Sequence, residues 1–142
     1  MIDFSKFEKK AGVKFKDKSL LKQAFVHRSY INENPKVGIG HNERLEFLGD
    51  AVLELAVTDY LYKKYRNETE GDLTAYRASL VNSTIIAEAA AKLGMNDYLL
   101  LSKGEAKDIG KARQYILANV FESFVGAVYL DLGYDKAEKF IA

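Results

Sequence analysis

The stretch that decides the fold is Asn42-Glu43-Arg44-Leu45-Glu46-Phe47-Leu48-Gly49-Asp50-Ala51-Val52-Leu53-Glu54-Leu55. It follows a loop of helix-breaking residues, 32–40, and its apolar residues recur every three or four positions. This spacing predicts the longest helix of the chain, residues 42–65, with Asn42 as its N-cap. Because a helix turns about 100° per residue, one side becomes the expected core face, made of Leu45, Leu48, Val52 and Leu55.

The acidic residues of this helix fall within a narrow stripe on the opposite side, made of Glu43, Glu46, Asp50 and Glu54. The simplest interpretation is a solvated face, since exposed carboxylates are common. Two features favour a function instead. Like charges at this spacing repel by about 0.2–0.5 kcal/mol per pair, and no Lys or Arg lies on the stripe to offset them. A mid-helix glycine, Gly49, costs roughly 1 kcal/mol against Ala, which indicates close packing or the close approach of another group.

A second polar pair, Asn119 and Glu122, lies in the nearly all-apolar stretch 114–132. Their spacing of three puts both side chains on one face of a helix. One interpretation is a carboxylate at the edge of the bundle, paired with a Lys. The other is that this helix packs beside the acidic stripe, because a buried carboxylate is costly unless it is paired or metal-bound. That packing would gather oxygen donors suited to magnesium or manganese rather than zinc or copper, namely Glu46, Asp50, Asn119 and Glu122.

The remaining sequence also has helical spacing, so we expect an all-α bundle of about seven helices and no strand. The expected helices cover residues 4–11, 19–25, 42–65, 70–80, 82–94, 114–132 and 135 onward. The polar stretch 102–112, which contains Gly104 and Gly110, is expected to be a loop. A single domain, residues 1–142, is the expected organisation for a chain of this length.

Composition excludes several classes of protein. Hydrophobic residues make up 48% of the 142, enough for a core, and the net charge of +1 excludes a histone-like basic protein and an acidic tail. The absence of Cys and the presence of only two His exclude a disulfide framework and a thiolate or His-rich zinc site. No uninterrupted apolar run approaches the ~18 residues of a membrane span, and the N-terminus has no apolar signal-peptide region. A cytoplasmic protein is therefore expected.

The near-neutral total hides an uneven distribution of charge. Residues 1–28 carry a net charge of +5, whereas residues 43–72 carry −4. A basic region beside an acidic metal site is the pattern expected of phosphodiester chemistry.

Four segments of the chain resemble, in order, the characteristic segments of the ribonuclease III family. The most specific is residues 42–51; the others are His27-Arg28-Ser29-Tyr30, residues 70–82 and residues 116–131. The likeness covers almost the whole chain and is greatest to the catalytic domain of the family's bacterial members. It implies an all-helical endonuclease domain that works as a homodimer and cleaves double-stranded RNA with Mg²⁺, or with Mn²⁺ as a substitute. It also implies 5′-phosphate and 3′-hydroxyl products with two-nucleotide 3′ overhangs, and a role in processing rRNA and other RNA.

The same resemblance implies roles for the acidic residues. The magnesium-site carboxylates that it implies are Glu46, Asp50 and Glu122, with Asp50 and Glu122 the pair most closely tied to hydrolysis. The outer acidic positions, nearer the RNA or the second subunit, are Glu43 and Glu70. The family usually has Asp where this chain has Asn119, which keeps an oxygen ligand but loses a charge. We therefore expect activity with a higher magnesium requirement.

Phe47 lies beside the acidic stripe, where periodicity alone favours a place in the core. The resemblance reverses this, because the matching aromatic inserts into a cavity of the partner subunit. It also places His27 and Arg28 near the packing of the N-terminal helices, so their first interpretation is structural. The candidate contacts to RNA phosphates are the basic side chains Lys14, Lys16, Lys18, Arg28, Lys107, Lys111 and Arg113.

Bacterial members of this type usually continue into a double-stranded RNA-binding domain, which we expect to be absent from this chain. Two other functions stay open at this point. The first is a catalytically weak or silent ribonuclease III-like scaffold that binds RNA. The second is a helical protein-interaction module whose acidic stripe is merely solvated.

Overall fold

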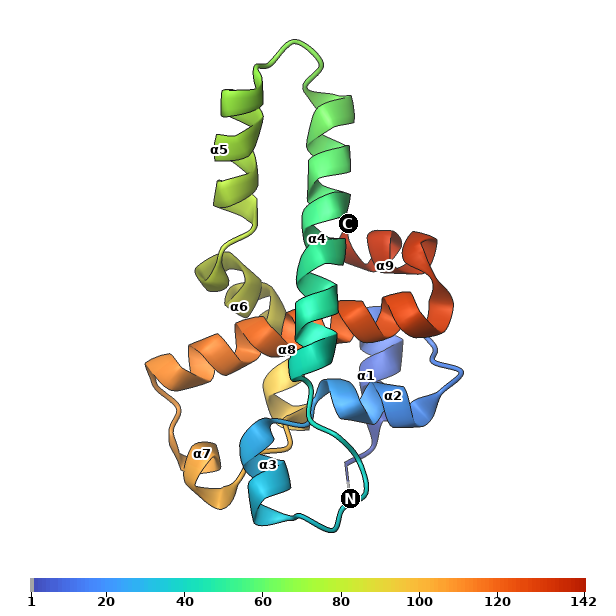
Figure 1. The fold of residues 1–142 in the computed structure, drawn as a ribbon, viewed down its shortest axis with the longest axis vertical. Coiled ribbons are helices and arrows are strands. Elements are labelled where there is room, and N and C mark those ends of the chain that lie inside the picture. Colours follow the sequence, from blue (N-terminus) through green and yellow to red (C-terminus); the bar gives the residue numbers. More distant parts are fainter. Residues whose placement is uncertain (1) are drawn as a thin grey trace.

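The computed structural model describes residues 2–142, and this part of the chain is all-α, as predicted (Figure 1). An isolated bridge between Val26 and Leu100 is the only strand-like pairing within it. In chain order the helices are α1 (Phe4–Ala11), α2 (Lys18–Ala24), α3 (Arg28–Glu33), α4 (Glu43–Lys64), α5 (Glu70–Leu80), α6 (Ser83–Lys92), the 3₁₀-helix η1 (Met95–Tyr98), α7 (Lys103–Lys107), α8 (Lys111–Leu132) and α9 (Tyr134–Ile141).

The described residues form nine α-helices rather than about seven, because two short helices, α3 and α7, were not predicted. Both are too short to show an apolar period, and side-chain caps begin them. The Nδ1 of His27 accepts a hydrogen bond from the Ser29 N–H at the start of α3. The Ser102 hydroxyl accepts one from the Glu105 N–H at the start of α7, within the stretch expected to be a loop.

The central element of the fold is α8, against which α2, α4, α6 and α9 pack. Figure 1 shows α8 running across the middle of the molecule, with α4 crossing it. Among the helices in residues 2–142, α8 alone is long and apolar enough to cross a membrane, yet 56% of its most apolar window is buried inside the domain. Its hydrophobicity is that of a core helix.

Two glycines let the backbones of α4 and α8 meet. A Cβ atom on Gly49 would collide with the carbonyl oxygen of Glu122 and lie 2.6 Å from its carbonyl carbon. A Cβ atom on Gly126 would likewise collide with the carbonyl oxygen of Leu45 and lie 3.1 Å from the Gly49 nitrogen. The cost of a glycine within α4 is thus explained by close packing, one of the two reasons considered from the sequence.

An aromatic cluster beneath this crossing holds the N-terminal helices to α8. Phe7 of α1 packs edge-on against Phe25 and Phe124, with ring centroids 5.2 and 5.1 Å apart. All three side chains are fully buried. Edge-to-face contacts of this kind add to the free energy gained from burying the rings.

Beyond the crossing, α4 continues away from the body and packs against α5, forming an arm (residues 58–80) (Figure 1). A hydrogen bond of 3.0 Å from Arg77 to the Thr58 hydroxyl joins the two helices, and α5 contributes no buried side chain. Leu55 lies just before the arm and is 55% exposed, so its predicted place in the core is wrong. The side chains of α4 that are buried at this point are Leu53 and Ala56, on a different face of the helix from Leu55.

Candidate active site at the helix crossing

The crossing of α4 and α8 sets Asp50 beside Glu122, two of the four side chains predicted to gather there. Because the Gly49 backbone touches the Glu122 backbone, the neighbouring Asp50 lies beside the Glu122 carboxyl. Glu46 lies one turn before Asp50 on α4, and Asn119 one turn before Glu122 on α8. We refer to Glu46, Asp50, Asn119 and Glu122 as the carboxylate site.

Burial and like charge oppose ionisation within the carboxylate site. Burial, a hydrogen bond with Asp50 and the charges of Asp50, Glu46 and Glu54 raise the pKa of Glu122 to about 8. Burial and the charges of Glu43 and Asp50 also raise the pKa of Glu46. None of the ion pairs formed within residues 2–142 involves a member of this site. The site therefore holds carboxyl groups that a cation from outside the chain would stabilise.

The donors of the carboxylate site suit a hard divalent cation. Three carboxylates and one amide oxygen are the ligand types that Mg²⁺ and Mn²⁺ prefer. As the side chains stand, residues 2–142 contain no group of three or more His, Asp or Glu already arranged around a cation position. Within the site, the charge of Asp50 opposes the ionisation of Glu122, an effect that a bound cation would offset. The residues present thus fit a divalent metal in the chemistry of their donor atoms.

Asn42 occupies the N-cap position of α4 but does not cap the helix, so this predicted role is wrong. Its side-chain amide points inward and donates to the Ala24 carbonyl oxygen at 3.0 Å and to the Ser123 hydroxyl at 3.5 Å. Ser123, fully buried on α8 beside Glu122, donates to the same Ala24 carbonyl at 2.6 Å. This buried network holds the start of α4 against α8. Ser123 was missed from the sequence, where its only signal is a hydroxyl in an apolar helix.

Glu43, at the start of α4, is held at the rim of the carboxylate site. Its carboxylate accepts two hydrogen bonds from Arg28, at 2.7 Å from Nε and 2.6 Å from Nη2. These bonds lower the pKa of Glu43. Its backbone N–H donates to His41 Nδ1 at 3.3 Å. His27, as expected, has a structural part, since it caps α3.

Two predicted residues lie away from the carboxylate site. Glu70 is the first residue of α5, which follows the far end of α4, whereas Glu46 lies in the first turn of α4. Phe47 is 83% exposed, so the core position favoured by periodicity alone is wrong. Its exposure agrees with the alternative interpretation as an apolar anchor for a second molecule.

Of the basic side chains predicted to contact RNA phosphates, some are bonded to other groups of the protein and others are exposed to solvent. Arg113 is buried, and its guanidinium donates to Asn96 Oδ1 at 2.7 Å and to carbonyl oxygens of α7, so a phosphate contact there is wrong. Lys18 pairs with Glu8 at 2.8 Å, and Arg28 pairs with Glu43. The exposed candidates that remain are Lys14, Lys16, Lys107 and Lys111.

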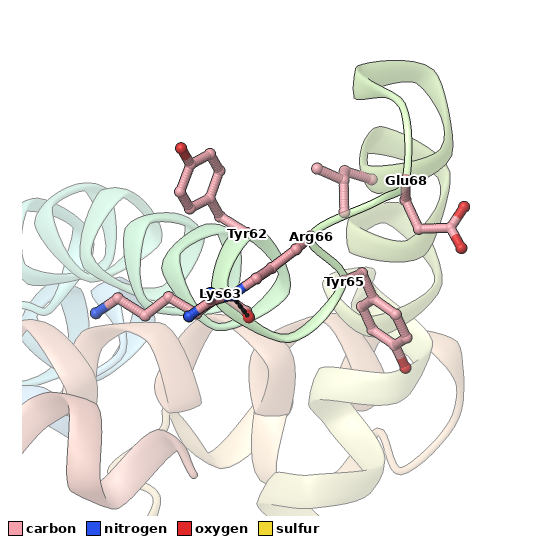
Figure 2. Close-up of a pocket in the computed structure, with 6 residues that line it drawn as sticks. Tyr62, Lys63, Tyr65, Arg66 and Glu68 are labelled. Carbon is pink, nitrogen blue, oxygen red and sulfur yellow. Dashed lines mark hydrogen bonds between the residues drawn. The ribbon is translucent and has the colours of Figure 1, made fainter.

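A cavity of about 420 Å³ lies at the tip of the arm, away from the carboxylate site (Figure 2). Its lining residues come from the end of α4, the turn and the start of α5, and they are Tyr62, Lys63, Tyr65, Arg66, Glu68 and Leu73. This hollow contains one carboxylate and no cluster of them. The crossing, rather than this cavity, is where the chemically competent groups meet.

The sequence of this chain is similar to that of a known protein family and of curated proteins. The family described as Ribonuclease-III-like matches residues 17–142. The chain is 48% identical to a curated protein named Ribonuclease 3 from Listeria monocytogenes, over 99% of this chain and 62% of that protein. The chain thus spans less than two thirds of the length of the curated relatives it matches.

Two solved structures extend the comparison to the fold. The nuclease domain of ribonuclease III from Campylobacter jejuni superposes with a TM-score of 0.88 and 40% identity, covering 97% of this chain and 92% of that one. That nuclease domain shows structural flexibility in the region involved in its dimer formation. Dicer from Pichia stipitis gives a TM-score of 0.66 and 29% identity over 89% of this chain and 52% of that one.

Proposed function

This chain belongs to the ribonuclease III family, and we propose that residues 1–142 form the nuclease domain of a Mg²⁺-dependent endoribonuclease that cuts double-stranded RNA. The observation that carries the proposal is the meeting of Asp50 and Glu122 where α4 crosses α8. Carboxyl groups crowded in a half-buried site oppose one another's ionisation, so a bound cation gives a reason for their proximity.

In this proposal the cation is held by the carboxylate site, and Mn²⁺ can replace Mg²⁺. A divalent cation there supplies a Lewis acid that activates water and stabilises the charge developing on the phosphate. Asp50 and Glu122 would accept hydrogen bonds from the attacking water. Glu122, whose pKa is raised to about 8, holds a proton at neutral pH in the free protein. Metal binding would release that proton, so metal affinity should rise with pH.

We also propose a homodimer in which each subunit cuts one strand of the duplex. Exposed Phe47, one residue from Glu46, supports a twofold contact close to the carboxylate site. Two sites facing one duplex would leave 5′-phosphate and 3′-hydroxyl ends with two-nucleotide 3′ overhangs. Cytoplasmic processing of rRNA and other RNA is the proposed setting.

The test is cleavage of an end-labelled RNA duplex with Mg²⁺ or Mn²⁺, compared with a single strand of the same sequence. We expect cutting of the duplex alone, with 5′-phosphate ends on the products. Glu122→Gln should abolish cutting while leaving the protein folded. Equal cutting of both RNAs, or unchanged cutting by Glu122→Gln, would contradict the proposal.

A second function, a catalytically weak or silent scaffold that binds RNA, is favoured by one observation. Asn119 supplies an amide where a fourth carboxylate would hold a cation more tightly. Intact duplex binding without cleavage at high Mn²⁺ would favour this scaffold. If Glu122→Ala changed neither metal affinity nor cleavage, the acidic stripe would be incidental, as in a protein-interaction module.

A further inference from the structure

Arg28 and Glu43 form a two-point contact between two helix starts. Arg28 is the first residue of α3 and Glu43 the first residue of α4. Two hydrogen bonds, of 2.7 and 2.6 Å, join the guanidinium to both carboxylate oxygens. A bidentate contact fixes the direction of the carboxylate as well as its distance.

The stability of the fold gives a weak reason for this contact. The two side chains are 62% and 42% exposed, and ion pairs so open to water add little to the free energy of unfolding. His41 Nδ1 lies farther from the same carboxylate, at 3.8 Å, and accepts a hydrogen bond from the Glu43 N–H. Arg28 thus makes the shortest ionic contact with Glu43, and its hydrogen bonds are the largest cause of the lowered pKa of Glu43.

The charge of Glu43 reaches the carboxylate site. Glu43 lies one turn from Glu46 on the same stripe, and its negative charge is one of the causes that raise the pKa of Glu46. Arg28 brings a positive charge to the same rim and opposes that effect. With the pair intact the rim is neutral, whereas loss of either partner leaves one unit of charge beside the site.

We propose that Arg28 is a positioning residue that fixes the Glu43 carboxylate and cancels its charge at the rim. The neutral pair thereby sets a balance between the affinity of the site for a divalent cation and its affinity for anionic RNA. This inference rests on the proposed function. An unpaired Glu43 would strengthen the attraction for a cation and repel RNA phosphates. An unpaired Arg28 would do the reverse.

The experiment compares four forms of the whole chain: the unaltered protein, Arg28→Gln, Glu43→Gln and the double variant. Free Mn²⁺ is titrated by electron paramagnetic resonance without RNA, and a labelled duplex is titrated in EDTA so that no cleavage occurs. Arg28→Gln should bind Mn²⁺ about three- to ten-fold more tightly and RNA more weakly. Glu43→Gln should shift both affinities the opposite way. The double variant should return both to within about two-fold of the unaltered protein.

A fifth form, Arg28→Lys, separates charge from geometry. It keeps the positive charge without the planar fork, so its affinities should lie between those of the unaltered protein and those of Arg28→Gln. The inference is overturned if Arg28→Gln and Glu43→Gln shift each affinity in the same direction, or leave both unchanged while Mn²⁺ still binds. If the unaltered protein binds no Mn²⁺ at all, the proposed function itself fails.

Discussion

The carbonyl oxygen of Glu122 occupies the space in which a side chain on Gly49 would begin. This contact links the fold to the candidate chemistry, because Gly49 directly precedes Asp50 and Glu122 is the residue whose carboxyl lies beside Asp50. A closer approach of two helices than ordinary side chains allow is what brings the carboxyls together. The glycine's cost within α4 is offset by packing that nothing larger could make.

Gly49→Ala should therefore destabilise the protein by about 3 kcal/mol or more, despite the better helix propensity of Ala. The added methyl group meets backbone atoms of α8, which cannot turn aside as a flexible side chain could. Urea unfolding followed by circular dichroism measures the effect. The matched control is Gly71→Ala in α5, where a Cβ atom would come no closer than 3.9 Å to its neighbour. Equal stability of the two variants would contradict the role of the crossing.

Glu122→Gln should stabilise the metal-free protein at neutral and alkaline pH. The folded-state pKa of Glu122, about 8, lies above the ordinary value of 4.5, so the folded state binds more protons between these values. The free energy of unfolding should then fall as pH rises from about 4.5 to 8, and Gln removes this fall.

The measurement for Glu122→Gln is the urea midpoint at several pH values in EDTA, and then with Mn²⁺. Mn²⁺ should raise the midpoint of the unaltered protein and leave the variant unchanged. Glu88→Gln, on the exposed face of α6, controls for the loss of one negative charge. Identical pH dependence for the unaltered protein and Glu122→Gln would rule out this account.

Phe47→Ala should shift the protein towards monomer. Removing an aromatic anchor from an interface costs about 2 kcal/mol or more, which is more than a ten-fold rise in the dimer dissociation constant. Sedimentation velocity over a range of concentrations measures the shift. Ile109→Ala removes an equally exposed apolar side chain, 80% exposed, from the loop before α8 and serves as the control. A dimer unchanged by Phe47→Ala would leave this residue without the proposed role.

Asn119→Asp should lower the magnesium concentration needed for half-maximal cleavage by about three- to ten-fold, since a carboxylate adds a negative charge beside the cation. The measurement is the cleavage rate of one duplex as a function of Mg²⁺. An equal or higher requirement would remove Asn119 from the metal's surroundings.

The sequence predicts the long helices well, but it predicts helix caps, the burial of single residues and side-chain pairings poorly. Helices with a clear apolar period, such as α4 and α8, follow from spacing alone. Spacing leaves open whether Glu122 pairs with a Lys or faces the acidic stripe of α4, and the contact between the two backbones at Gly49 sets it beside Asp50. Asn42 fits the pattern of a cap, but buried partners on α8 compete for its amide, and these are distant in sequence. Leu55 fits the core period, but periodicity cannot reveal that burial at this point of α4 falls on Leu53 and Ala56 instead. The pairing of Arg28 with Glu43 spans an intervening loop whose path no local pattern specifies.

The composition of α5 has a consequence for how the molecule fluctuates. An 11-residue helix that buries no side chain draws its order from a capping box at Thr69 and from contacts with the end of α4. Its amide hydrogens should thus exchange with solvent long before those of α8, through partial opening that leaves the rest of the molecule intact. If a second subunit covers the arm, ordering of this segment and association become one coupled equilibrium, and deuterium uptake there would report assembly directly.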